Sequence, residues 1–255
     1  MKYFYLLLMF AAGAAVLSAQ WESVSFQDAG GIYSASSELE KPESPAEIGR
    51  YSPRNLFDHN TATAWVEGEA GSGSGSYVLT GVSRGLKKYL IIYNGYQQTE
   101  SLFKKNNRVR ELKISLYAGY SFDAMAGQFG FEAESLSLGE PVTVTLDDTI
   151  GPQRFKLPFD PVKAGKLKES GRRKFIDDFS PGDGVKDFFF LKFEIVSVYP
   201  GTKWDDTCIS GIEFTDNPLG IYIPVNEKIK TVFKDSKSGD IMAVSYTHLT
   251  LPTKA

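Results

Sequence analysis

Short apolar segments, separated by turn residues, recur along most of the chain. In two of them, residues 111–116 (ELKISL) and 191–198 (LKFEIVSV), most apolar and polar positions alternate. Alternation with a period of two is typical of a strand with one buried and one exposed face. The spacing of the segments favours an all-β sandwich across residues 20–215. The segments that we predict as strands are 76–81, 88–96, 110–120, 141–146, 187–199 and 207–214.

Two segments interrupt this rhythm, and no long stretch shows a strong helical period. Residues 68–76 (GEAGSGSGS) have the composition of a flexible loop, and no G-K-[ST] follows to indicate phosphate binding. Residues 162–175 (VKAGKLKESGRRKF) hold six basic residues and one acidic residue, and the acidic stretch DDFSPGDGVKD comes next. We interpret this basic segment as a solvated loop or short helix that pairs with its acidic neighbour.

The composition is that of a folded domain with little net charge. With 255 residues, 42% of them hydrophobic, the chain has enough apolar side chains to bury one core. The 28 basic and 31 acidic residues are mixed along the sequence and leave a net charge of -3. Nucleic-acid-binding domains usually show a basic excess or a basic patch. We therefore expect a monomer without a nucleic-acid partner.

The two ends of the sequence differ from the predicted domain. Residues 1–19 combine Lys2, an apolar run over 3–17 and small residues, the pattern of a secretory signal peptide. That run is shorter than the ~20 residues of a membrane-spanning helix, so we expect no transmembrane segment after cleavage. The chain is then periplasmic, cell-surface or extracellular. Residues 216–243 indicate a linker or the start of a downstream region, and residues 244–255 resemble a translated sequencing adapter.

The residue types needed for most catalytic sites are scarce. Cys208 is the one cysteine, which excludes an internal disulfide framework, and His59 is the one histidine before residue 244. Nucleophilic triads and histidine-rich metal sites therefore lack material. Asp205 and Asp206 are neighbours, and on a strand they would point to opposite faces. The sequence favours a protein that is not an enzyme.

Four motifs occur in a fixed order along the chain. They are YSPRNLFDHNTATAWVEG (51–68), GSGSGSYV (71–78), IIYNGYQQTESLFKKNNRVRELKISL (91–116) and VYPGTKWDDTCISGIEF (198–214). Together they resemble the NADase-type glycan-binding domain, a family related to discoidin-like and galactose-binding-domain-like modules. The resemblance spans residues 40–215 and implies an antiparallel jelly-roll β-sandwich whose end loops bind a glycan or cell-surface polysaccharide. It does not imply cleavage of NAD.

Residues within these motifs are candidates for sugar contact. Tyr96 follows a turn in which Gly95 permits a positive φ, and its ring can cover a sugar face. Asn107 and Arg108 offer directional hydrogen bonds to hydroxyls. A structural role stays open for each, because polar loop residues often bond to nearby backbone. The candidate ligand-binding residues are Asn94, Tyr96, Asn107, Arg108 and Glu67.

The loop that precedes Trp65 is a candidate metal site. In discoidin-like relatives a D-x-[DN]-x-x-T-x-W loop often binds calcium, and the resemblance places Asp58, Asn60 and Thr63 at its ligand positions. Here His59 replaces a usual glycine, and Gly211 replaces a usual glutamate. We therefore expect a loop held by the hydrogen bonds of Asp58 and Asn60, with calcium at most a structural ion. We also predict that Trp65 and Trp204 are largely buried and that His59 is exposed.

These features favour an exported, non-catalytic carbohydrate-binding module that needs no cofactor and binds its glycan weakly and without calcium. Two alternatives stay open. In the first alternative, the chain is an accessory domain of a longer exported enzyme. In the second, it is an envelope domain that binds other proteins. Sugar retention by this chain alone would distinguish a carbohydrate-binding module from an envelope domain that binds other proteins.

Overall fold

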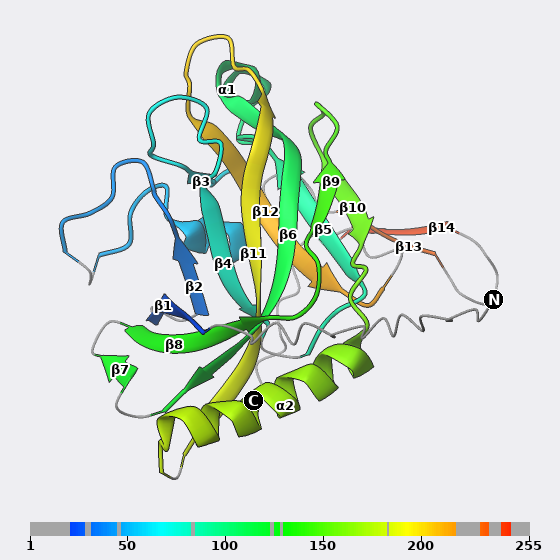
Figure 1. Cartoon of the computed structure of the whole chain (residues 1–255). Coiled ribbons are helices and arrows are strands. Elements are labelled where there is room, and N and C mark those ends of the chain that lie inside the picture. The colour runs from blue at the N-terminus through cyan, green and yellow to red at the C-terminus, as the bar shows by residue number, and fades with distance from the viewer. Residues whose placement is uncertain are drawn as a thin grey trace, which may run out of the picture.

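The computed structural model describes residues 21–28, 32–44, 47–82, 85–122, 125–127, 130–182, 184–217, 230–234 and 241–245. Strands dominate it (Figure 1), so the predicted all-β class is confirmed. All six segments predicted as strands are strands. The strands of the main sheet are β1 (Glu22–Asp28), β2 (Ile32–Ala35), β3 (Trp65–Val66), β4 (Tyr77–Val82), β5 (Tyr89–Asn94), β6 (Asn107–Ser121), β7 (Ala126–Gly127), β8 (Gly130–Ser137), β9 (Val142–Thr145), β10 (Pro152–Lys156), β11 (Lys186–Tyr199) and β12 (Thr207–Thr215).

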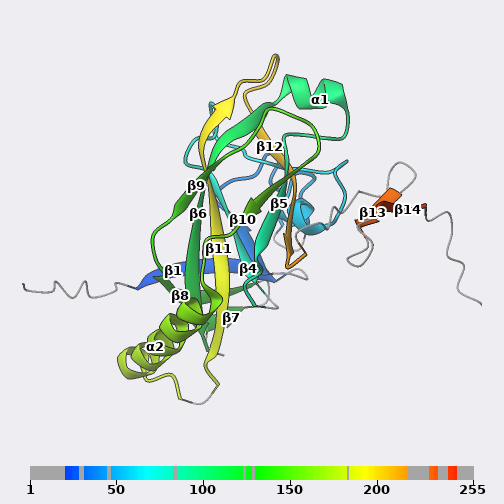
Figure 2. The ribbon, with the colours of Figure 1, turned by 90° about the vertical axis from the view of Figure 1, so that its right-hand side faces the viewer.

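These twelve described strands join in one folded sheet. The order along it is β10-β5-β12-β6-β11-β4-β2-β1-β8-β7, with β3 beside β12 and β9 beside β6. Nearly all neighbours are antiparallel, as predicted, but β12 runs parallel to β6 over Thr207–Cys208. Because β8 pairs with both β1 and β6, the sheet closes on itself. The long strands β6 and β11 run side by side from one end of the molecule to the other (Figure 2).

The predicted alternation places one face of β6 and β11 in the core. The inward side chains are at most 2% exposed, whereas their neighbours are less deeply buried or exposed. The β6–β11 register shifts at Ser197, and such a bulge re-aims side chains. Val196 beside it is 40% exposed. The buried positions are Leu112, Ile114, Leu116, Leu191, Phe193 and Ile195.

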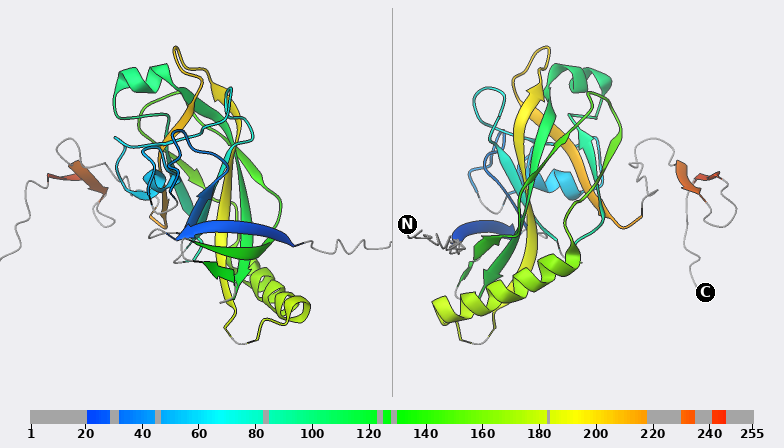
Figure 3. Two further views of the ribbon diagram at one scale, coloured as in Figure 1. Left: turned by 90° about the vertical axis from the view of Figure 1, so that its left-hand side faces the viewer. Right: turned by 45° about the vertical axis from the view of Figure 1, so that its right-hand side comes forward.

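A helix of 19 residues, α2 (Pro161–Phe179), lies across one end of the sandwich (Figures 1 and 3). It contains the basic segment, so the sequence prediction of a loop or short helix underestimated its length. Lys168 and Arg172 form ion pairs with Asp187, which confirms the pairing with the acidic neighbour. Gly171 leaves room for Tyr120, whose hydroxyl donates a 2.8 Å hydrogen bond to the carbonyl oxygen of Lys168.

Two shorter helices accompany the loops of the sandwich. At the end opposite α2 lies α1 (Glu100–Lys105), and Thr99 caps it by accepting a hydrogen bond from the backbone N–H of Leu102. The short 3-10 helix η1 (Pro53–Phe57) precedes the Asp58 loop and packs against β12 and β3. The candidate residues of the sequence motifs thus gather around the α1 end and the adjoining loops.

The ends of the chain are described in part. The predicted signal peptide (1–19) lies outside the described residues, as do 218–229, 235–240 and 246–255. Between these gaps, β13 (Lys230–Lys234) and β14 (Ile241–Ser245) pair only with each other, and residue 244 falls within β14. In the part of the chain that the structure describes, no helix combines the length and apolar character needed to cross a membrane.

Candidate functional site

A hollow of about 250 Å³ lies beside α1, at the end of the sandwich opposite α2. We call it the aromatic hollow because Tyr51, Tyr96 and Trp204 contribute rings to its wall. Drug-sized ligands occupy pockets of roughly 300–1,000 Å³, so this hollow suits one small ring-sized group. Its other lining residues are Leu39, Glu40, Val66, Leu102, Asn106 and Asp206.

Backbone hydrogen bonds fix the separate segments that form this wall. Val66 of β3 accepts from the N–H of Leu39 at 2.9 Å, and its own N–H donates to the carbonyl of Tyr51 at 3.3 Å. On the other side, the N–H of Trp204 donates to the carbonyl of Lys105 at 2.9 Å, which joins the β11–β12 loop to the end of α1. Residues far apart in the sequence are therefore held in one arrangement.

Several polar groups of the hollow have no hydrogen-bond partner among the described residues. They are the hydroxyls of Tyr51 and Tyr96, the indole N–H of Trp204 and Oδ1 of Asn106. Tyr96 is 8% exposed and Asn106 is 6% exposed. Buried polar groups are nearly always paired. Unpaired ones that line a hollow are therefore available to a polar ligand.

The side chains around the hollow carry both signs of charge. Burial raises the pKa of the Asp206 carboxyl, and the neighbouring charge of Asp205 raises it further. On the outside, the Lys203 ammonium lies 4.5 Å from the centre of the Trp204 ring, and the Arg50 guanidinium lies 5.1 Å from that of Tyr51. Trp204 is less deeply buried than Trp65 but is not exposed, which agrees with the prediction that it is largely buried. It stands in a surface loop rather than in the core.

Asn94 and Asn107, two of the predicted ligand residues, bond to the backbone around the hollow. Asn94 exchanges two hydrogen bonds with the backbone of Val109 on β6, at 2.7 and 2.9 Å, directly before the turn that presents Tyr96. Asn107 donates to the carbonyl of Asp205 and accepts from the N–H of Gly201, both at 2.6 Å. The geometry therefore favours the structural alternative for Asn94 and Asn107.

The guanidinium of Arg108 also forms its hydrogen bonds within the protein. Its guanidinium donates to both carboxylate oxygens of Asp148, at 2.8 and 2.7 Å, and to the carbonyls of Asn106 and Pro200. Arg108 is 7% exposed, and these bonds leave few of its N–H groups available to a sugar. Both Arg108 and Asn107 instead brace the β11–β12 loop that carries Trp204.

The Glu67 carboxylate is also buried behind this loop. It accepts hydrogen bonds from the backbone N–H groups of Thr207 at 3.1 Å and Glu69 at 2.8 Å. Burial raises the pKa of Glu67 above its ordinary value, although these two bonds act against the shift. Glu67 thus ties β3 to β12 beneath the hollow and does not line it.

The Asp58 loop satisfies its own polar groups. Asp58 accepts from the N–H of Asn60 at 2.8 Å and from the hydroxyl of Thr63 at 2.7 Å, and Asn60 Oδ1 accepts from the N–H of Ala62 at 3.0 Å. This confirms the predicted hydrogen-bonded loop. His59 has a φ of 58°, in the left-handed region that favours glycine, and its side chain is 56% exposed, as predicted.

The hydrogen bonds of this loop hold its shape without an ion. The oxygens of Asp58 and Asn60 already accept hydrogen bonds within the loop, and Gly211 brings no carboxylate. No cluster of three or more histidine, cysteine, aspartate or glutamate residues suited to a metal occurs among the described residues. Calcium-independent binding stays a prediction.

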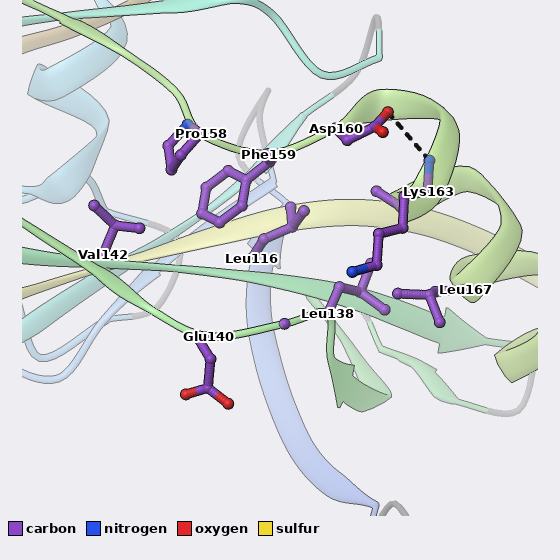
Figure 4. A pocket seen from close by; sticks show the side chains of 11 residues that line it. Leu116, Leu138, Glu140, Val142, Pro158, Phe159, Asp160, Lys163 and Leu167 are labelled. Atoms are coloured by element: carbon purple, nitrogen blue, oxygen red, sulfur yellow. Dashed lines mark hydrogen bonds between the residues drawn. The ribbon is translucent and has the colours of Figure 1, made fainter.

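A second cavity, of about 280 Å³, lies at the start of α2 (Figure 4). Its walls are mainly apolar, with Leu116, Leu138 and Phe159 among them. Asp160 at its edge caps α2 by accepting from the N–H of Val162 at 2.8 Å, and Glu140 points away from it. Unlike the aromatic hollow, this cavity has a single aromatic ring, that of Phe159, in its wall.

Sequence reasoning found one wall residue of the aromatic hollow, Tyr96, and missed most of the others. Tyr51 and Asn106 lie inside the quoted motifs, but nothing in their spacing indicates a shared cavity. Trp204 was assigned to the core because large aromatic residues beside strands usually pack there. Asp206 was considered only as a partner of Asp205 in catalysis. The signal that was available was the placement of Tyr51 and Trp204 in polar loops rather than in alternating strands.

The fold and the hollow define a class of protein: a β-sandwich module with a small aromatic cavity among its loops. Residues 27–215 match the model of the family described as NAD glycohydrolase translocation F5/8 type C domain, and the chain belongs to that family. The discoidin-like resemblance of the four motifs is thereby confirmed. A search of the curated proteins found no match.

Solved structures with a similar fold include three of different kinds. The arabinofuranosyltransferase AftD from Mycobacteria is 14% identical, with 75% of this chain and 11% of that chain covered, at a TM-score of 0.39. The chain thus spans about a tenth of that protein. A family 32 carbohydrate-binding module from C. perfringens NanJ, in complex with galactose, is 11% identical, covering 75% and 97%, at a TM-score of 0.36. An F5/8 type C domain from Bacteroides fragilis is 12% identical, covering 76% and 95%, at a TM-score of 0.36.

Proposed function

We propose that this protein is an exported, non-catalytic module that binds a glycan in the aromatic hollow. One observation carries the proposal: the rings of Tyr51, Tyr96 and Trp204 meet in one small cavity whose own polar groups lack partners within the described residues. The predicted signal peptide supports export, and the scarcity of histidine and cysteine supports a binding role over catalysis.

The chemistry of the hollow matches that of a sugar ring. One face of a pyranose is apolar and packs on an aromatic ring, while its hydroxyls need directional donors and acceptors around the edge. The Trp204 indole supplies a donor, Asn106 Oδ1 supplies an acceptor, and the tyrosine hydroxyls supply both. Because the hollow is small and open, we expect it to hold one terminal sugar unit with low affinity.

A glycan array with the purified chain tests this proposal, followed by titration of the best sugar into variants. Trp204→Ala and Tyr96→Phe should each weaken binding, the first by removing a ring and the second by removing an unpaired hydroxyl. Tyr117→Phe is the matched control, since Tyr117 stacks on Phe190 in another part of the core. Unchanged affinity in both hollow variants would contradict the proposed site, and an array without any signal would favour a protein-binding role.

The array is repeated with a chelator to test the proposed independence from calcium. We expect the same sugars and the same affinities, because the loop of Asp58, Asn60 and Thr63 is held by its own hydrogen bonds. Loss of the signal with chelator, and recovery with added calcium, would show that the loop needs the ion.

A further inference from the structure

The wall of the aromatic hollow carries carboxylates and no cation. Glu40 and Asp206 are its charged lining residues, and neither forms an ion pair within the described part of the chain. Two further carboxylates interact with Asp206. The charge of Asp205 raises the pKa of Asp206, and the charge of Asp206 raises the pKa of Glu67. A ligand in the hollow therefore meets carboxylates but no cation in the wall itself.

Three cations beside the hollow lie over aromatic rings of its wall. Arg50 lies over Tyr51, and Lys105 and Lys203 lie over Trp204 at 5.8 and 4.5 Å. None of the three lines the cavity. Tyr96 has no cation over its ring among the described residues. The interior of the hollow thus keeps both an unneutralised carboxylate and a ring able to attract a positive charge.

One open polar atom of the interior, Oδ1 of Asn106, is an acceptor only. Asn106 uses its Nδ2 to donate to the carbonyl of Leu102 at 2.8 Å, which directs its Oδ1 elsewhere. Asn106 is 6% exposed and its Oδ1 has no partner in the described residues, so this oxygen is available to a donor on a ligand in the hollow. An ammonium group supplies three donors and one positive charge.

Resting on the proposed sugar-binding function, we infer that the preferred ligand of the hollow is an amino sugar whose amine is free and positively charged. The ammonium faces Asp206 and Asn106, and the sugar ring lies against the aromatic wall. Glu40 at the exposed edge adds to the attraction. A sugar with an acetylated amine keeps the ring and the hydroxyls but loses the charge.

Nuclear magnetic resonance titration of the full chain with D-glucosamine and N-acetyl-D-glucosamine tests this inference. The unmodified protein should bind glucosamine about tenfold more tightly, the difference expected when one charge-assisted hydrogen bond becomes neutral. Asp206→Asn should remove this preference while retaining the weaker binding of the acetylated sugar. Asp205→Asn is the matched control, because Asp205 is exposed and does not line the hollow, and it should keep the preference.

The possible outcomes separate the inference from the function on which it rests. Equal binding of both sugars, or tighter binding of the acetylated one, overturns the amino-sugar inference and leaves sugar binding intact. A preference that survives Asp206→Asn also overturns it, since the charge at Asp206 then plays no part. Binding of neither sugar, together with an empty glycan array, contradicts the proposed function itself. A denaturation midpoint for each variant confirms that it is folded.

Discussion

Trp65 and Trp204 lie within two of the sequence motifs but occupy different surroundings. Trp65 is 1% exposed, packs in the main core and donates its indole N–H to the carbonyl of Ser37 at 3.0 Å. Trp204 stands in the β11–β12 loop, with lysines against its ring. The first ring therefore serves stability, and we assign the second to binding.

Alanine substitution should separate these two roles. Trp65→Ala is expected to lower the free energy of unfolding by about 3–5 kcal/mol, the usual cost of truncating a buried aromatic side chain. Trp204→Ala should leave the denaturation midpoint nearly unchanged but weaken sugar binding. Chemical denaturation and sugar titration of both variants provide the measurements. A stable Trp65→Ala variant, or an unstable Trp204→Ala variant, would show that the assignment is reversed.

The buried carboxylate of Glu67 makes a pH-dependent contribution to stability. Its pKa is raised above 4.5 in the folded state, so the folded protein holds this proton more tightly than the unfolded chain. The contribution is full below the unfolded pKa and is lost as the pH rises through the folded pKa. The Glu67→Gln variant loses one hydrogen-bond acceptor. Its free energy of unfolding should nevertheless decrease less than that of the unmodified protein over the same pH range. Parallel stability curves for the two proteins would contradict the raised pKa.

Among the elements, α2 depends on one glycine in its buried face. A Cβ at Gly171 would overlap the hydroxyl oxygen of Tyr120, which bonds to the carbonyl of Lys168. At Gly165 of the same helix, a Cβ would meet nothing within 4 Å. Alanine favours a helix over glycine by roughly 0.5–1 kcal/mol, so the surroundings decide the sign of each substitution.

Gly171→Ala should destabilise the protein and Gly165→Ala should stabilise it slightly, as measured by thermal unfolding. The second variant is the control for helix propensity alone. If both substitutions raise the melting temperature, Tyr120 yields to the new methyl group and the close packing of α2 is not required.

Some of the secondary-structure elements could be predicted from the sequence, and others could not. The strands β6 and β11 follow from alternation because their middle parts, 111–116 and 191–195, bury one face in the main core. α2 was not recognised as a long helix, since it buries only Ala164, Gly171 and Phe175 and exposes a mixed charged surface. The family motifs located the loops of the site and Tyr96. They did not separate wall residues from the buried Asn107 and Arg108, because bracing a loop and binding a sugar require the same polar side chains.

At the scale of the whole molecule, the domain that matches the family is self-contained among the described residues. The strands β13 and β14 form their own two-stranded sheet, and the twelve-stranded sheet ends with β12 in sequence. We therefore expect removal of residues 218–255 to change neither the melting temperature nor sugar affinity appreciably. A large loss of stability in the shortened protein would show that the C-terminal part contributes to the fold.

The central claim is that sugar binds in the aromatic hollow at the α1 end. Mapping of backbone amide shifts during titration with the sugar selected on the array tests it most directly, because the map reports where the ligand sits. We expect the largest changes at Tyr51, Tyr96, Asn106 and Asp206. Changes concentrated around the cavity at the start of α2, or in the Asp58 loop, would contradict it.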